Sequence, residues 1–394
     1  MNGTIYMPVG EVCSSISDTY REKKNMVTLI NTSDVLEGRV LNHERVPNSN
    51  LKGQFKKTFQ RDDILYSEIR PQNRRFAYVD FSPIDYIAST KLMVIRAKKD
   101  VVSPKYLYYF LKNSSTVAEL QLLAETRSGT FPQITFSEVA NLTIPVPSLA
   151  VQEVIVQTMQ CLEDKITCNE QINDNLEQQA QAIYHERFET VSPNDLPYDW
   201  RIVTLGEVAT ISNKSFNPLK EPEILLEHYS IPAFDEARFP VFELSTSIKS
   251  NKFIIDASCF MISKLNPTTK RVWKPYCLTE DAVCSTEFIV YKAKDQSITD
   301  FLYSVIDSGS FSDFMCSHVT GSTGSRQRTT PAETLSYKLI LPSENELAEF
   351  QSLVSPMYAQ MRINAIENDK LKRLRDSLLP RLMSGEIDVS DIPL

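Results

Sequence analysis

The stretch SLAVQEVIVQTMQCLEDKITCNEQINDNLEQQAQAIYHERFE, residues 148–189, decides how this 394-residue chain folds. Its apolar residues and two asparagines are spaced alternately by four and three positions, which keeps them in one stripe along a supercoiled helix. The stripe comprises Ile155, Met159, Leu162, Ile166, Asn169, Asn173, Leu176, Ala180 and Ile183. We therefore predict one long coiled-coil helix in this part of the chain.

The same stripe recurs 195 residues later, with asparagine at the same two steps. The second copy comprises Phe350, Val354, Met357, Met361, Asn364, Asn368, Leu371, Arg375 and Leu378. Further upstream the offset is 196: ILYSEIRP at 64–71 matches FMISKLNP at 260–267, and Gly-Glu-Val at 10–12 matches Gly-Glu-Val at 206–208. The chain is therefore a tandem duplication of one unit, a globular segment followed by a long helix.

The duplication predicts six segments along the chain. They are a first globular segment (1–147), a first long helix (148–190), a connector (191–200), a second globular segment (201–342), a second long helix (343–387) and a tail (388–394).

Each globular segment has strand patterns first and helix patterns later. Runs rich in β-branched and aromatic residues predict short strands at 63–70, 76–80 and 91–96, and at 259–265 and 287–292 in the second copy. Ser103-Pro104 is typical of a helix start. The predicted fold class is α+β: a β-rich α/β domain followed by a long helix, duplicated, with the two helices packed as an antiparallel coiled coil.

The duplication also predicts how the two long helices meet. Two copies of one unit usually associate about a pseudo-twofold axis, which makes the helices antiparallel and brings Asn169 and Asn173 close to Asn368 and Asn364. Buried asparagine in an apolar seam fixes the register at a cost in stability. The alternative is that these asparagines are half exposed and only tolerated; their presence in both copies favours the register role.

The ends of the second helix carry stop and start signals. Ser343 followed by Glu346 predicts a capping box, and Ser384-Gly385 predicts a left-handed helix stop. A helix of about 40 residues is ~60 Å long at ~1.5 Å per residue. An antiparallel pair of this length could serve as a spacer between two globular segments.

Composition is that of a globular protein, with 42% hydrophobic and 23% charged residues. No apolar run is long enough to span a bilayer and the first ten residues lack signal-peptide features, so we expect a soluble, cytoplasmic protein. The seven cysteines include no CxxC pair, and the four histidines lie far apart in the sequence. Neither a disulfide framework nor a metal site is expected.

The net charge of −8 argues at first against a nucleic-acid partner. However, residues 148–190 hold eight acidic against two basic residues, and residues 343–391 hold nine against six. The rest of the chain carries a net charge of +1. The acidic charge is concentrated on the long helices, so the globular segments remain candidates for binding DNA.

Basic residues cluster in both globular segments, where they could neutralise phosphates or read bases. The candidates are Lys52, Lys56, Lys57, Arg61, Arg70, Arg74 and Arg75 in the first segment, and Lys264, Lys270, Arg271, Lys274, Arg326 and Arg328 in the second. For any one of them the alternative is an ordinary solvated cation. Positions 70–75 and 266–274 occupy equivalent, hairpin-like places but differ in sequence. Two readers built on one scaffold would differ in this way.

Motifs of catalysis are missing from the sequence. It contains no GxxxxGK[ST] phosphate loop, no GxGxxG and no HExxH, so we predict no catalytic residues. The run GSTG at 321–324 is interpreted as a turn rather than a phosphate cradle. The chain is predicted to be a binding protein.

Two motifs resemble a known family. The run IPVPSLAVQ at 144–152 with the following LEDKITCNEQINDNLEQQAQAIY, and the ending LRDSLLPRLMSGEI at 374–387, resemble the conserved regions of type I restriction-modification specificity subunits. The duplicated layout extends the resemblance over nearly the whole chain. The chain departs from the family before Gln152, where Leu-Ala-Val replaces a proline-rich step and a glutamate.

The resemblance implies a non-catalytic subunit that reads a bipartite double-stranded DNA target. Each globular segment would be a target-recognition domain for one half-site, and the helices would set the spacing. Two methyltransferase subunits would dock on the chain and restriction subunits would join them. The chain would bind no cofactor itself, whereas its partners would use S-adenosylmethionine, ATP and Mg.

Two functions from other classes stay open at this point. A stand-alone DNA methyltransferase or nuclease would need a catalytic motif that the sequence lacks. A coiled-coil scaffold that binds other proteins would not need DNA, and salt-dependent DNA binding would exclude it as the main function.

Overall fold

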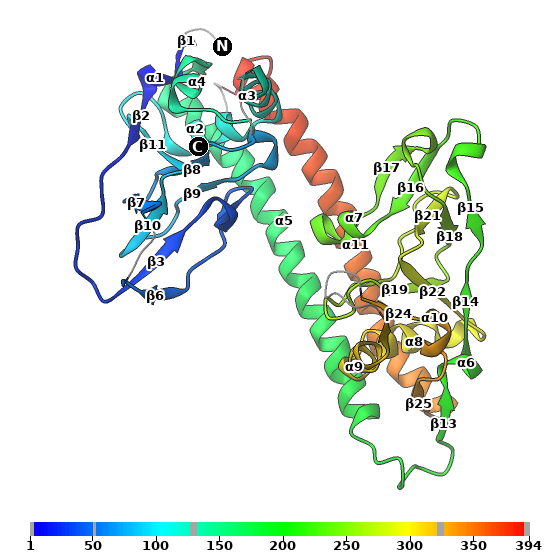
Figure 1. The fold of residues 1–394 in the computed structure, drawn as a ribbon. Coiled ribbons are helices and arrows are strands. Elements are labelled where there is room, and N and C mark those ends of the chain that lie inside the picture. The colour runs from blue at the N-terminus through cyan, green and yellow to red at the C-terminus, as the bar shows by residue number, and fades with distance from the viewer. Residues whose placement is uncertain (1–3, 50–52, 127–131, 321–326, 390–394) are drawn as a thin grey trace. The chain divides into compact units, whose positions relative to one another are not determined.

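The computed structural model describes residues 4–49, 53–126, 132–320 and 327–389 (Figure 1). The chain forms two compact units: unit 1 comprises Met1–Lys165 and Leu371–Leu394, and unit 2 comprises Ile166–Lys370. Each unit therefore contains one globular segment together with part of both long helices.

The long helices are α5, Leu149–Tyr184, and α11, Glu344–Ser384. A π-helical turn, His185–Glu189, follows α5. Both helices begin within one residue of the predicted start. Gly385 has φ +78°, which confirms the predicted left-handed stop of α11.

Only half of the predicted capping box forms at the start of α11. The Glu346 backbone N–H donates to Ser343 Oγ at 3.4 Å. The Glu346 carboxylate lies instead 3.6 Å from Arg187 Nη1, because an ion pair with α5's continuation competes for it. The prediction of a reciprocal bond from the Ser343 backbone was wrong.

Unit 1 contains twelve of the described strands and four short helices. The strands are β1 Ile5–Pro8, β2 Cys13–Ile16, β3 Met26–Ile30, β4 Val35–Leu36, β5 Arg39–Val40, β6 Arg45–Pro47, β7 Phe55–Lys57, β8 Ile64–Ser67, β9 Phe76–Tyr78, β10 Tyr86–Ser89, β11 Leu92–Ala97 and β12 Thr143–Val146. The helices are α1 Val9–Val12, α2 Pro104–Lys112, α3 Ser114–Thr126 and α4 Phe136–Asn141.

Unit 2 repeats this series with additions. The strands are β13 Arg201–Thr204, β14 Ala209–Ser212, β15 Ser215–Phe216, β16 Leu225–Tyr229, β17 Val241–Leu244, β18 Lys252–Ile254, β19 Cys259–Ser263, β20 Val272–Trp273, β21 Ala282–Ser285, β22 Phe288–Ala293, β23 Val319–Thr320, β24 Arg328–Thr329 and β25 Lys338–Leu341. The helices are α6 Leu205–Val208, α7 Ile231–Ala237, α8 Thr299–Ile306, α9 Gly309–Ser317 and α10 Pro331–Thr334.

The sheets confirm the duplication. Unit 1 has an antiparallel sheet of order β2-β11-β8-β9, and unit 2 has the matching order β14-β22-β19-β20. A second sheet, β6-β3-β10-β7, corresponds to β17-β16-β21-β18, to which unit 2 adds β15. In both second sheets one pair is parallel, β3 with β10 and β16 with β21.

The strand register is duplicated as well. Leu92 lies opposite Ser67 in unit 1, and Phe288 lies opposite Ser263 in unit 2, each residue shifted by 196. The paired end strands β1–β12 and β13–β25 keep the same relation. Because a slip of one residue would turn buried side chains outward, this identity shows that both copies use one core pattern.

Each globular core includes side chains from the long helices. In unit 1, Ile155 and Met159 of α5 and Leu382 of α11 are buried in the same cluster as the strands and α2. In unit 2, Tyr184 and Phe350 of the two helices pack with Phe301 of α8. Full burial of one such side chain contributes roughly 1.5–3 kcal/mol, so the helices are part of the cores.

The predicted stripe faces inward along both helices. Ile155, Met159, Ile166, Asn169, Asn364 and Asn368 are buried, and Leu162, Asn173, Leu176, Ile183, Met357, Met361, Leu371 and Leu378 are half-buried. Within unit 2 the helices run antiparallel, since Asn169 contacts Asn368 while Asn173 contacts Asn364.

The four asparagines form a network with local twofold symmetry. Asn169 Nδ2 donates to Asn368 Oδ1 at 2.8 Å, and its equivalent Asn364 Nδ2 donates to Asn173 Oδ1 at 2.8 Å. Asn368 then donates to the Ile166 carbonyl and Asn173 to the Met361 carbonyl. Since buried amides need such partners, the network favours one register, as the sequence predicted.

Candidate nucleic-acid interface

The candidate interface is built around one loop in each unit, between β8 and β9 and between β19 and β20. The Ser67 N–H donates to the Arg75 carbonyl at 2.8 Å, and the Ser263 N–H donates to the Arg271 carbonyl at 2.9 Å. Arg70 and its equivalent Asn266 both have left-handed backbones, with φ of 45° and 48°. The two loops therefore share one backbone frame, in the equivalent places that the sequence predicted.

The predicted cations of unit 1 differ in their surroundings. Lys56 and Arg61 are exposed and have no side-chain partner within the part of the chain that the structure describes. Arg70 is exposed on the loop. Arg74 Nη2 donates to Ser114 Oγ at 3.0 Å, and Arg75 Nη1 donates to the Ser33 carbonyl at 3.1 Å.

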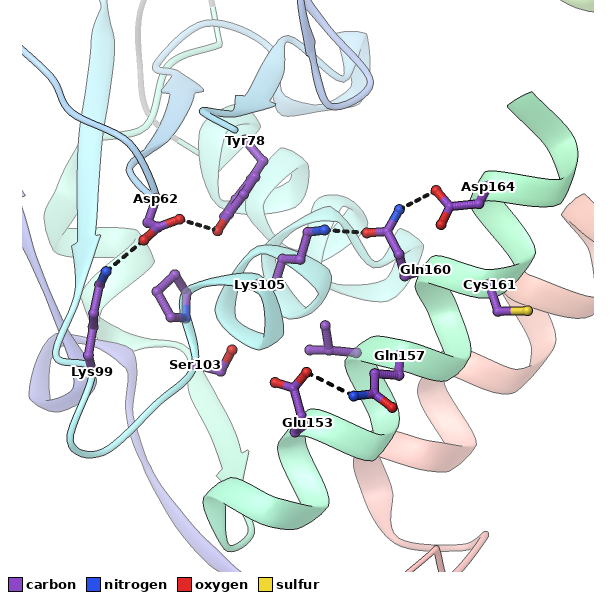
Figure 2. A pocket seen from close by; sticks show the side chains of 12 residues that line it. Asp62, Tyr78, Lys99, Ser103, Lys105, Glu153, Gln157, Gln160, Cys161 and Asp164 are labelled. Atoms are coloured by element: carbon purple, nitrogen blue, oxygen red, sulfur yellow. Dashed lines mark hydrogen bonds and ion pairs between the residues drawn. The ribbon is translucent and has the colours of Figure 1, made fainter. Parts of the chain in front are cut away.

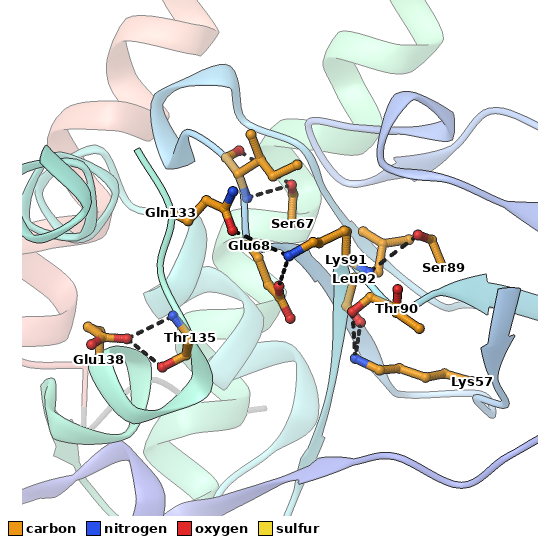
Figure 3. A network of polar contacts seen from close by, with 11 residues as sticks. Lys57, Ser67, Glu68, Ser89, Thr90, Lys91, Leu92, Gln133, Thr135 and Glu138 are labelled. Carbon is orange, nitrogen blue, oxygen red and sulfur yellow. Dashed lines mark hydrogen bonds and ion pairs between the residues drawn. The ribbon is translucent and has the colours of Figure 1, made fainter. Parts of the chain in front are cut away.

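Lys57 has an internal role. Its Nζ donates to the carbonyls of Thr90 and Leu92 at 3.1 and 2.8 Å (Figure 3). Burial lowers the pKa of Lys57. The ammonium therefore connects β7 to the β10–β11 turn, and Lys57 stabilises the fold of this region.

The predicted cations of unit 2 are mostly held by carboxylates. Lys270 Nζ lies 2.7 Å from Asp307 Oδ1, Arg271 makes a two-bond contact with Asp235, and Lys274 pairs with Asp300. Arg328 donates to both oxygens of Glu287, at 3.0 and 3.1 Å.

Three further positions complete the set of predicted cations. Lys264 is half-buried, and its side chain makes no hydrogen bond or ion pair with any residue that the structure describes. Lys52 and Arg326 lie outside the described residues. For all candidates DNA contact stays a prediction. Among the described candidates, Lys56, Arg61 and Lys264 are those whose side chains make no hydrogen bond or ion pair within the protein.

The sequence did not single out a polar network in unit 1 that borders the loop. Lys91 Nζ donates to Glu68 Oε2 and to Gln133 Oε1, each at 3.3 Å (Figure 3). None of these residues belongs to a basic cluster. Setting the two copies side by side at the 196 and 195 offsets would have shown that all three positions change charge between the copies.

A groove lies between the start of α2 and one face of α5 in unit 1 (Figure 2). Its volume is about 540 Å³, and Asp62, Tyr78, Lys105, Val156 and Gln160 are among its lining residues. Lys99 Nζ lies 2.6 Å from Asp62 Oδ2, and Tyr78 donates to Asp62 at 2.8 Å. The groove is therefore mixed, with charged, polar and a few apolar side chains in its lining.

Unit 2 has a groove of about 360 Å³ at the equivalent place. It is lined by Ser258, Lys274, Asp300, Gln351 and Ser355, which correspond in the duplication to the five residues just named for unit 1. Each unit thus has a groove at an equivalent place that combines its globular segment with the helix that follows that segment in the chain.

The described residues show neither a metal-binding cluster nor a membrane-spanning helix. Among the described residues no group of three or more His, Cys, Asp or Glu side chains is placed to hold a metal ion. No helix in the described ranges is long and apolar enough to cross a membrane.

Known proteins with similar sequences are specificity subunits. A family model described as the type I restriction modification DNA specificity domain matches residues 6–178. The specificity subunit of the type I restriction enzyme HindI from Haemophilus influenzae is 28% identical, over 92% of this chain and 94% of that protein. The MjaIX specificity subunit from Methanocaldococcus jannaschii is 24% identical, over 79% of this chain and 77% of that protein.

Solved structures resemble the fold along its length. The S subunit of a type I restriction-modification system from M. genitalium matches with a TM-score of 0.53 and 14% identity, over 97% of this chain and 96% of that chain. A chain from a structure of the assembly and conformational transition of a type I R-M system gives 0.50 and 18%, over 98% and 99%. At these identities the likeness supports the fold alone. The sequence matches and the duplicated architecture therefore make the chain similar to the specificity subunits of type I restriction-modification systems, and they support that role for it.

Proposed function

We propose that this chain is the non-catalytic, DNA-reading component of its complex, and that each unit reads one half of a bipartite double-stranded target. The observation that carries the proposal is the pair of loops on one backbone frame. Both frames keep the same backbone bonds, while the residues they present differ, as at Arg70 and Asn266. Readers of two different half-sites need a common scaffold and different side chains.

The helices would act as the spacer between the two readers. At ~1.5 Å per residue the 36 residues of α5 span ~54 Å and the 41 residues of α11 span ~62 Å. Half-sites read from one face of DNA are separated by about one helical turn, ~34 Å, or a multiple of it. The asparagine network supports this role because a spacer needs a fixed register.

Two methyltransferase subunits would dock on the chain, and restriction subunits would join that assembly. The two equivalent grooves support a stoichiometry of two, since a duplicated surface binds one copy of the same partner in each unit. The partners would bring the chemistry, with S-adenosylmethionine, ATP and Mg bound on them and not on this chain.

Methylation assays on the purified chain and on its complex test this proposal. The complex with its methyltransferase subunits should methylate sequences that contain two defined half-sites and a gap of undefined bases. The chain alone should bind DNA without methylating it. Methyl transfer by the chain alone would contradict the non-catalytic role, and a contiguous target would contradict two readers.

A further inference from the structure

One corner of the loop frame is the same in both units, bond for bond. Its first bonds join the start of the loop to the residue just before β11 or β22: the Glu68 N–H donates to the Lys91 carbonyl at 3.0 Å, and the Lys264 N–H donates to the Glu287 carbonyl at 2.9 Å. These residues are equivalent in the duplication.

The frame also fixes a third segment. The Ile134 N–H donates to the Glu68 carbonyl at 2.9 Å, and the Thr329 N–H donates to the Lys264 carbonyl at 3.1 Å. Isolated bridges pair Ile69 with Gln133 and Leu265 with Arg328. Gln133 and Arg328 are therefore held at one backbone position on the two copies.

The side chains at this corner are inverted in charge. Glu68, Lys91 and Gln133 in unit 1 correspond to Lys264, Glu287 and Arg328 in unit 2. In unit 1 the ammonium of Lys91 holds the Gln133 carbonyl oxygen at 3.3 Å (Figure 3). In unit 2 the carboxylate of Glu287 holds the Arg328 guanidinium in a two-bond contact.

In both units, then, the residue at this position is oriented by the same neighbouring position. Gln133 and Arg328 are half-buried, so each side chain is supported at its stem and reachable from solvent. The neighbour is a hydrogen-bond donor where the supported group is an amide oxygen, and an acceptor where it is a guanidinium. An oriented polar group at a rigid site is what discrimination between bases requires.

The two side chains match two different bases. Glutamine forms two hydrogen bonds with the N6 and N7 atoms of adenine in the major groove, and arginine does so with O6 and N7 of guanine. An amide oxygen has two lone pairs, so Gln133 can keep its bond from Lys91 while it accepts from adenine N6.

We infer that residues 133 and 328 are equivalent base-reading positions of the two units, with Gln133 directed to an adenine and Arg328 to a guanine. Lys91 and Glu287 are the positioning residues that orient them. This inference rests on the proposed function, because it assigns base contacts within a DNA-reading role. The alternative is that the corner is only a structural ion pair whose charges differ between the copies. DNA recognition would then not depend on residues 133 and 328.

The test uses the complex of the chain with its methyltransferase subunits, carrying Arg328→Gln or Gln133→Ala. Methylated sequences are mapped, and affinity is measured for the mapped target and for a random duplex. The control is Lys338→Gln, which also removes one positive charge but lies exposed on β25. Melting temperatures close to that of the control show that the variants fold.

We expect Arg328→Gln to lower affinity for the mapped target by roughly 5- to 150-fold and to change the preferred base at one position of one half-site. Gln133→Ala, which removes the amide without placing a second cation beside Lys91, should lower affinity and relax the base preference at one position of the other half-site. An unchanged set of methylated sequences, or equal weakening on target and random DNA, would overturn the inference.

Three further outcomes keep the test decisive. If Arg328→Gln does not fold, Gln133→Ala carries the test, since it removes no ion pair and adds no charge beside Lys91. If the unmodified complex shows no preference for any sequence, the proposed function itself fails. If the unmodified complex has a clear target and both variants keep it, only the assignment of residues 133 and 328 fails.

Discussion

The corner at Glu68, Lys91 and Gln133 in unit 1 and the corner at Lys264, Glu287 and Arg328 in unit 2 share their backbone bonds but not their charges. A second inversion lies at the end of the helix after the sheet. Lys112 of α2 is buried beside Glu163, and its equivalent Asp307, after α8, is buried beside Lys270. The two copies share the backbone hydrogen bonds of these places but differ in the charges of the side chains there.

The seam between the long helices shows the opposite behaviour. Asn169 and Asn173 recur as Asn364 and Asn368, and the four hydrogen bonds among these residues and the two backbone carbonyls form two equivalent pairs, although Asn169 alone also donates to Glu367 at 2.7 Å. The difference between loops and seam indicates where each kind of constraint acts. Under the proposed function the loops differ because each unit reads its own half-site, while the seam stays constant because one register serves both units.

The largest expected effect follows from shortening the seam. Removing one heptad from each helix, at facing positions, shortens the spacer by ~10 Å, or about 3 base pairs at ~3.4 Å each. The complex should then methylate sites with both half-sites unchanged and a gap about 3 base pairs shorter. Mapped sites that keep the original gap would show that the helices do not set it.

Replacing one asparagine of the seam sharpens the distinction between seam and loops. Asn169→Ala leaves Asn368 without its donor in a buried position, which costs roughly 1–3 kcal/mol of unfolding free energy. Asn364→Ala, its symmetry equivalent, should cost a similar amount. Denaturant unfolding of both variants measures this cost. A loss of unfolding free energy in only one variant would show that the two equivalent asparagines do not contribute equally to stability.

The buried carboxyl of Asp307 predicts a pH dependence specific to unit 2. Burial raises the pKa of Asp307 to about 6, although Lys270 lies beside it. The folded state therefore binds this proton more tightly than the unfolded state does, so unfolding free energy falls as pH rises from about 4 through about 6. The loss amounts to about 3 kcal/mol at about 1.4 kcal/mol for each pKa unit.

Asp307→Asn should remove that fall, which thermal unfolding at about pH 4 and about pH 7 measures. The counterpart in unit 1 behaves in the other sense, because burial lowers the pKa of Lys112. A variant that keeps the full pH dependence would show that another group causes it.

The smallest expected effect separates two neighbouring lysines on β7. Lys57→Ala removes two internal bonds to carbonyls and should cost roughly 1–3 kcal/mol in stability while leaving the target sequence unchanged. Lys56→Ala should leave stability unchanged and weaken DNA binding on all sequences, with a salt slope lower by about 1. Equal effects of the two variants on DNA affinity would contradict this assignment.

The sequence predicted the features that repeat along the chain. The seam spacing predicted both long helices, the 195 and 196 offsets predicted the paired sheets, and the asparagines predicted the register. These features could be predicted because they depend on periodicity and on similarity between the copies, and both can be read from the amino-acid sequence.

The partners of the charged side chains could not be predicted in the same way. Arg75 bonds to the carbonyl of Ser33 and Arg271 to the carboxylate of Asp235, each about 40 positions away in the chain. A basic cluster in the sequence does not show which of its cations such distant groups hold. The reciprocal bond of the capping box failed for the same reason, since Arg187 takes up the Glu346 carboxylate.

Exchange of residues 10–147 for the corresponding segment of another family member tests most directly whether one chain contains two independent readers. The readout is the set of methylated sequences made by the complex before and after the exchange. The account predicts that one half-site changes completely, while the other half-site and the gap stay as they were. A change in both half-sites, or in neither, would contradict independent reading by the two units.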